Sequence, residues 1–250
     1  RIFDCFMFYD EEMLLDIRLN ILNKFIDQFI IIESTFSHNG KKRELIFDIE
    51  KYKKFKNKIK YFVVDQKPGE IETINSYDTD HIKENKTIMN AVWFENSQRN
   101  AINTLLTSAD DNDQIIISDL DEIPNLENIN FKNIKNKLIL FKQKMFYYKF
   151  NLFLDNMDWC GSKSCKKKDL LTPQWLREIK DKKYPLWRID TLFSKKKYSN
   201  LYFIKNGGWH FTCLRTAEDL EKKLLNFAHH YECEESGLNI DNLKQLMAEK

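Results

Sequence analysis

Two aspartates at the end of an apolar run are the residues best suited to chemistry. The segment 115–124 reads IIISDLDEIP, so Asp119 and Asp121 follow a hydrophobic strand pattern and precede a proline. Side chains two positions apart on an extended backbone point the same way, so both carboxylates could bind one hard cation. A strand that ends in acidic residues and then proline is typical of the carboxyl edge of an open α/β sheet, where such folds bind ligands. The pattern predicts a metal site.

Alternating strands and helices are predicted to position these aspartates. The patterns predict strands over 2–8, 29–34 and 60–65 and a strand that begins at 115 and runs into the two aspartates. They also predict a broadly apolar helix over 10–25 and a polar helix over 94–106. Repeated strand and helix units favour a mostly parallel sheet. Glu33, Asp65 and Asp119 would then gather at one edge of that sheet. The expected fold class is α/β.

The second half of the chain is less regular. Residues 138–148 predict a long strand, whereas 155–200 mix Trp, Gly, Pro and Lys without periodicity and are predicted to be substrate-facing loops. A strand over 201–211 is broken by Gly207 and Gly208, which permit unusual backbone geometry or close approach, and the break brings in His210. Helices are expected after Thr216. No interdomain linker is evident, so a single domain is predicted.

Composition narrows the classes of function. The 250 residues contain 40 Lys and Arg against 38 Asp and Glu, and a net charge of +2 argues against a nucleic-acid partner. Five scattered cysteines suit a reducing compartment. No apolar run is long enough to span a membrane, and the start at Arg1 shows neither signal peptide nor anchor. We therefore expect a cytoplasmic protein, and the Lys-, Asn- and Ile-rich composition indicates a microbial or viral source.

Four motifs in order resemble one enzyme family. They are CFMFYDEEMLLDIRLNIL, FIIIES, SDLDEIP and GGWHF, and they are similar to glycosyltransferase family 17, the family of the bisecting β-1,4-mannosyl-glycoprotein N-acetylglucosaminyltransferase. The resemblance spans most of the chain. It implies a single GT-A-type domain over 1–250, with a nucleotide-binding half (1–124) and an acceptor-binding half with C-terminal helices (125–250). It also implies inverting transfer of N-acetylglucosamine from UDP-GlcNAc to a glycan hydroxyl.

The resemblance implies roles for the acidic residues. Asp121, with Asp119 directly or through water and the ribose, would hold Mn²⁺ or Mg²⁺ against the donor diphosphate, and His210 would complete the metal site. Inversion needs a carboxylate that takes the proton of the acceptor hydroxyl, and Asp190 and Glu122 are the candidates for this catalytic base.

Donor contacts are implied at the first strand ends and around the metal site. The candidates are Phe6, Phe8, Glu33, Asp65, Arg99, Asp119, Trp159 and Trp209. Asp65 could accept the uracil N3–H, Arg99 could reach the diphosphate or an acid of the site, and the two tryptophans, with Gly161, could wall the sugar. Gln174 and Arg177 also resemble the family, without an assignable role.

Each candidate also has a structural interpretation. An Asp-x-Asp turn is often only solvated, and a lone histidine is often a core residue. Glu33 and Arg99 could pair with one another or cap a helix, and Glu122 could orient other groups instead of acting as base. The lysine clusters at 163–168, 180–183 and 195–197 are either solvated loops or a basic rim for a membrane surface or an anionic or lipid-linked acceptor.

Two other classes of function stay open at this stage. A metal-dependent nucleotidyltransferase would also use paired carboxylates, but nothing before Asp119 resembles its glycine-rich phosphate loop. A non-catalytic carbohydrate- or nucleotide-binding protein would have no need of the full set of Asp119, Asp121 and His210. The chain departs from animal family members in having Ser118 where those carry an acid and in lacking a membrane anchor. The resemblance therefore indicates the donor more firmly than the acceptor, which could be a surface polysaccharide or a lipid-linked sugar.

Overall fold

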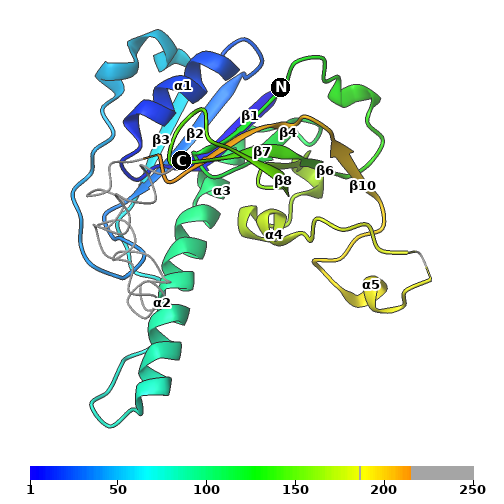
Figure 1. Ribbon diagram of the computed structural model, residues 1–250. Helices are drawn as coiled ribbons and strands as arrows, with labels where there is room; N and C mark the ends of the chain where they lie inside the picture. The colour runs from blue at the N-terminus through cyan, green and yellow to red at the C-terminus, as the bar shows by residue number, and fades with distance from the viewer. Residues whose placement is uncertain (186, 215–250) are drawn as a thin grey trace.

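A seven-stranded sheet forms the centre of the fold in a computed structural model that describes residues 1–185 and 187–214 (Figure 1). Its strand order is β10-β6-β9-β4-β1-β2-β3, and only β9 runs antiparallel to its neighbours. The strands are β1 (Ile2–Met7), β2 (Gln28–Ser34), β3 (Ile59–Val64), β4 (Gln114–Ile117), β6 (Leu138–Phe141), β9 (Lys163–Lys166) and β10 (Leu201–Ile204). The α/β prediction with a mostly parallel sheet is confirmed.

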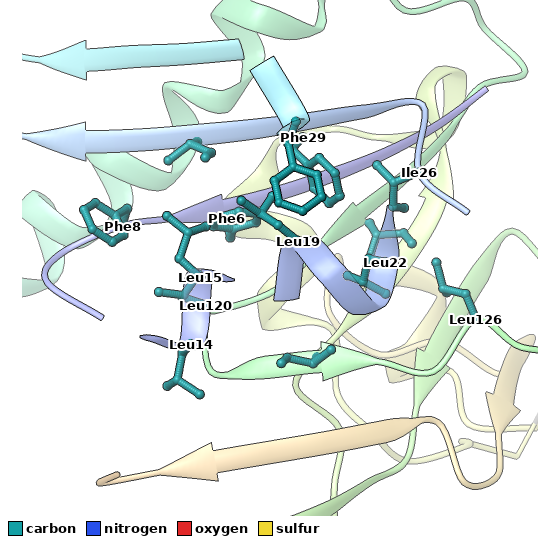
Figure 2. Close-up of a cluster of buried hydrophobic side chains, with 14 of the residues drawn as sticks. Phe6, Phe8, Leu14, Leu15, Leu19, Leu22, Ile26, Phe29, Leu120 and Leu126 are labelled. Carbon is teal, nitrogen blue, oxygen red and sulfur yellow. The ribbon is translucent and has the colours of Figure 1, made fainter. Parts of the chain in front are cut away.

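Helices cover both faces of this sheet, so its strands are apolar on both sides. The described residues form helices α1 (Glu12–Leu22), α2 (Asp80–Asn100), α3 (Ile102–Leu105), α4 (Pro173–Glu178) and α5 (Asp190–Phe193), with 3₁₀ turns η1 (Ile49–Lys58), η2 (Leu106–Ser108), η3 (Phe131–Asn133) and η4 (Lys167–Asp169). Helix α1 packs leucines against Phe6 and Phe29 of the strands (Figure 2). Ile102 of α3 and Leu176 of α4 pack against alternate strand residues such as Ile30.

A second, four-stranded sheet receives three chain segments from the first. Its order is β5-β11-β7-β8, with β5 (Glu122–Pro124), β7 (Gln143–Tyr147), β8 (Phe153–Trp159) and β11 (Gly208–Thr212). Strands β4, β6 and β10 each end in the first sheet, and the chain continues into β5, β7 and β11 of the second. Gly208 makes one of these crossings with φ of +128°, and a Cβ there would overlap the Ile123 carbonyl. The predicted break at the paired glycines is confirmed.

Three predicted elements differ in extent from the structure. The polar helix expected from residue 94 begins at Asp80, where Thr79 accepts a hydrogen bond from the Ile82 N–H as an N-cap. The single strand expected over 138–148 is wrong, because β6 and β7 lie in different sheets. The loops expected over 155–200 are wrong as well, since this stretch contains β8, β9, α4 and α5. The helices expected after Thr216 lie outside the described residues.

Within the described residues, no helix is both long enough and apolar enough to cross a membrane.

Candidate active site at the Asp-x-Asp turn

The turn between β4 and β5 presents the two aspartates. The Asp119 N–H donates to Glu122 Oε2 at 2.8 Å, and the Glu122 N–H donates to the Asp119 carbonyl at 3.1 Å, which closes the turn. Ser118, Leu120 and Glu122 are buried, whereas the side chains of Asp119 and Asp121 are 37% and 19% exposed. The backbone here is a turn and not the extended strand that the prediction assumed, yet Asp119 and Asp121 are the more exposed residues of the segment 118–122.

A buried arginine that sequence reasoning missed fixes the backbone of this turn. Arg18 of α1 is fully buried and binds Asp4 of β1 through two hydrogen bonds of 2.8 and 2.6 Å. Its remaining Nη1 donates to the carbonyls of Asp119, Leu120 and Glu122 at 3.1, 3.2 and 2.7 Å. A guanidinium can satisfy several acceptors in one plane, so Arg18 holds the turn against the main sheet.

Asp119 is held by two arginines from different helices. Arg99 of α2 donates to Asp119 Oδ1 at 2.9 Å, and Arg177 of α4 donates to Oδ2 at 2.7 Å. Burial raises the pKa of Asp119, but the charges of Arg177 and Arg99 outweigh it and hold the pKa well below its usual range. Asp119 is therefore ionised, with both oxygens engaged.

Glu122 is buried and fully engaged. Its carboxylate accepts from Trp159 Nε1 at 2.7 Å and from Arg177 Nη1 at 2.7 Å, in addition to the Asp119 N–H. A Cβ on Gly161 would overlap both Glu122 and Trp159, so only glycine fits there. This geometry favours the orienting role that the sequence left open for Glu122. Its role as catalytic base stays an untested prediction.

Contacts between helices α2 and α4 place Arg99 and Arg177 side by side at Asp119. Thr172 Oγ1 accepts from the Trp175 N–H at 3.0 Å and Pro173 occupies the first turn, so α4 has a capped start. Gln174 docks on α2, because its N–H donates to Asn100 Oδ1 at 3.0 Å and its side-chain oxygen accepts from Arg99. The two residues that resembled the family without a role, Gln174 and Arg177, thus belong to the site.

Lys163 anchors the other end of α4. It lies buried in β9, and its ammonium donates to the Arg177 carbonyl and, at 2.6 Å, to the Ile179 carbonyl. A cation at a helix C-terminus satisfies carbonyls that have no helical partner. Burial lowers the pKa of Lys163 to about 8. The first predicted lysine cluster, 163–168, is therefore not a solvated loop, because it begins in the central sheet.

His210 lies beside Asp121 on the second sheet. Strand β11 pairs with β5 so that His210 stands opposite Glu122, and the ring stacks on Trp159 with centroids 5.1 Å apart. Nε2 is 3.5 Å from Asp121 Oδ2, and Nδ1 is buried with no hydrogen-bond partner within the described part of the chain. Burial lowers the pKa of His210, but the Asp121 carboxylate beside the ring raises it more, so the net direction is upward.

The Asp121–His210 pair fits a shared metal ion. A distance of 3.5 Å is too long for a strong hydrogen bond. Two donors bonded to one ion at about 2.1 Å lie about 3.0 to 3.4 Å apart, which is close to this spacing. No third His, Cys, Asp or Glu completes a metal cluster with them among residues 1–185 and 187–214. Mg²⁺ and Mn²⁺ sites commonly take their remaining ligands from substrate phosphates and water.

Several predicted donor contacts lie in the core. Phe6 and Phe8 are buried, so only their backbone could face a nucleotide. Trp209 packs against the core on the side of β11 opposite to His210, because neighbouring residues on a strand alternate. Trp159 lies at the site, bonded to Glu122 and stacked on the histidine. Of the two tryptophans, the structure brings only Trp159 to the metal candidates.

The remaining candidates are spread along the sheet edge and beyond. Glu33 is buried and pairs with Arg43 at 3.1 Å, so the alternative pairing of Glu33 with Arg99 is wrong. Asp65 is exposed directly after β3. Asp190 belongs to α5, which projects beyond α4 (Figure 1), and binds Arg188 and Lys197. These hydrogen bonds lower the pKa of Asp190.

Comparisons with known proteins agree with this picture only in part. No curated protein matches the chain. Among solved structures, the chain is similar to one assigned as a glucose-1-phosphate thymidylyltransferase from Bacillus anthracis, solved with sucrose, at 12% identity and a TM-score of 0.37, over 84% of this chain and 87% of that chain. This likeness is too weak to support an argument. The family model "Glycosyltransferase family 17" matches residues 1–248. The chain therefore belongs to glycosyltransferase family 17 and is a glycosyltransferase.

Proposed function

We propose that this glycosyltransferase transfers N-acetylglucosamine from UDP-GlcNAc to a hydroxyl of a glycan acceptor, with inversion and with a divalent metal ion. The observation that carries the metal-dependent part is the juxtaposition of Asp121 and His210 at 3.5 Å beside the Asp-x-Asp turn. Family membership supports a nucleotide sugar as donor and a glycan as acceptor. The choice of UDP-GlcNAc rests on the sequence motifs.

Asp121 and His210 would hold the metal ion in this proposal. Oxygen ligands suit both Mg²⁺ and Mn²⁺, and an imidazole ligand tilts the choice towards Mn²⁺. When bound, such an ion supplies Lewis-acid stabilisation of the charge that develops on the leaving diphosphate. Because both oxygens of Asp119 accept from arginines, the geometry favours an indirect role for Asp119, through water or the ribose.

The two arginines are the protein groups best placed to bind the diphosphate. Arg99 and Arg177 converge on Asp119 from α2 and α4, and a guanidinium matches paired phosphate oxygens in a fork. Asp119 and Glu122 would keep Arg177 oriented before the donor arrives. Preorganised cations at the position where negative charge develops stabilise the transition state at little reorganisation cost.

The catalytic base is the remaining assignment. Inversion requires a carboxylate on the acceptor side, and Glu122 is occupied by three donors. Asp190, on α5, stays the other candidate, although its low pKa makes it a weak proton acceptor. Turnover by Asp190→Asn with UDP binding unchanged would exclude it.

Calorimetric titration tests the proposal. UDP-GlcNAc, UDP-glucose, UDP-galactose and CTP are titrated with Mn²⁺ and with EDTA into the wild type, Asp121→Asn and the control Asp111→Asn, whose side chain is exposed and outside the site. We expect binding that prefers UDP-GlcNAc, needs Mn²⁺ and survives only in the wild type and the control. A preference for CTP, or binding indifferent to Mn²⁺ and to Asp121, would refute the proposal.

A further inference from the structure

A projecting segment after α4 exposes large apolar side chains. We define the α5 lobe as residues 180–185 and 187–197, which surround α5 and lie at the side of the central sheet in Figure 1. Trp187, Ile189 and Phe193 are 80%, 72% and 84% exposed. Ile189 and Phe193 are four residues apart across the helical turn, so they project from one face. We call these three exposed side chains, which lie within seven positions of the sequence, the apolar patch of the lobe.

The same segment concentrates positive charge. Residues 180–197 contain seven Lys and Arg and two Asp, a net charge of +5, whereas the whole chain has a net charge of +2. The rest of the chain is therefore net negative. Lys180, Lys182, Lys183 and Lys195 are exposed and flank the apolar patch on both sides in the sequence. The low net charge of the whole chain argued against a polyanion partner, but it is an average over a strongly cationic segment and a net negative remainder.

Backbone and side-chain contacts join the two flanks of the lobe and anchor it on α4. The Lys180 N–H donates to the Lys196 carbonyl at 2.9 Å, which closes the base of the lobe. Trp175 of α4 donates from Nε1 to the Lys195 carbonyl at 2.6 Å, and Lys196 pairs with Glu178 at 2.7 Å. The apolar tip therefore extends from a base that the protein itself fixes.

We propose that the α5 lobe docks on an anionic membrane surface. Tryptophan and phenylalanine rings favour the boundary between headgroups and acyl chains, and lysines beside them are attracted by anionic headgroups. Long lysine side chains can keep their charge in the headgroup layer while the apolar patch is buried. A glycan alone would match the aromatic rings but not the net charge of +5 or the exposed isoleucine.

Docking would tether the candidate active site to the bilayer through α4. The lobe follows α4 directly, and α4 carries Arg177, which binds Asp119 and Glu122. If the proposed function holds, the acceptor class that fits this placement is a lipid-linked glycan, because its sugar would be presented at the membrane surface. Lipid docking itself does not depend on the donor assignment.

Vesicle co-sedimentation tests the docking. The full chain is spun with vesicles of phosphatidylcholine alone and with one-third phosphatidylglycerol, at low and high salt. Variants are Trp187→Ser with Phe193→Ser, and Lys182→Gln with Lys183→Gln and Lys195→Gln. The controls are Tyr77→Ser, which removes an equally exposed aromatic residue (82%) elsewhere, and Lys53→Gln with Lys54→Gln and Lys56→Gln, exposed lysines on η1.

We expect partitioning onto the anionic vesicles that falls with salt, at least tenfold weaker binding by both lobe variants, and wild-type binding by both controls. UDP-GlcNAc titration with Mn²⁺ on the same variants should be unchanged, so a failure of the donor assignment is seen separately from a failure of docking. Absence of binding to anionic vesicles at low salt, or equal losses in the lobe and control variants, would overturn the proposal. Retention by a soluble glycan in place of vesicles would overturn it too.

Discussion

Replacement of Arg18 by methionine tests whether a buried cation builds the Asp-x-Asp turn. Arg18 makes five hydrogen bonds, two to Asp4 and three to carbonyls of the turn. Removal of one partner of a buried ion pair costs about 3 to 5 kcal/mol, since the other charge is left unpaired. Each carbonyl left without a donor adds about 1 kcal/mol or more. We therefore expect Arg18→Met to lower the free energy of unfolding by about 5 kcal/mol or more.

Urea unfolding followed by circular dichroism measures this loss. Such a loss is a large part of the total stability of a typical domain, about 5 to 15 kcal/mol, so the variant should unfold at much lower urea. The double variant Asp4→Asn with Arg18→Met should be more stable than Arg18→Met alone, because no buried charge is left unpaired. A loss below about 1 kcal/mol, or a double variant less stable than the single one, would refute the argument.

Three further perturbations follow from the site. Gly161→Ala should lower stability by about 1 to 3 kcal/mol, since its Cβ would overlap Glu122 and Trp159; Gly69→Ala, with no atom within 4 Å of the new Cβ, is the control in the same urea assay. Between pH of about 8 and about 10.5, Lys163 binds a proton more often in the unfolded chain than in the folded one. The free energy of unfolding of the wild type should therefore rise with pH relative to that of Lys163→Met. Parallel curves of unfolding free energy against pH for the two proteins would contradict this. Protonated imidazole cannot bind a metal, so Mn²⁺-dependent donor binding should weaken as pH falls through the raised pKa of His210, and calorimetry that shows no change would disprove its role as a ligand.

The sequence located the two aspartates and several of the residues around them, but it missed Arg18. Asp119 and Asp121 stand out because acidic residues directly follow an apolar strand run, and the break before His210 follows from paired glycines. Arg18, in contrast, lies in a leucine-rich helix, where a charged residue is expected to face solvent. Its function depends on Asp4 and on carbonyls about a hundred residues away in the chain, which no local pattern reveals.

The donor contacts show the same limit. Phe6 and Phe8 are candidates because the resemblance implies donor contacts at the first strand ends, and Trp209 is a candidate because it stands beside His210. Which face of a strand points to solvent, however, depends on what packs on it. Phe6 and Phe8 lie in the core with leucines of α1, and Trp209 is half-buried against that core. The sequence alone gives Arg177 no role. Its position at the site depends on the contact of α4 with α2 through Gln174.

By itself, the sequence determined the α/β class, the family and the acidic turn, because periodicity and motif order are local properties of the chain. Tertiary structure alone decided which charges meet. It sets two arginines on Asp119, leaves Asp121 facing His210, and buries Glu122 beneath Trp159. Such pairings depend on distances between segments far apart in sequence, and only the packing of helices on the two sheets fixes those distances.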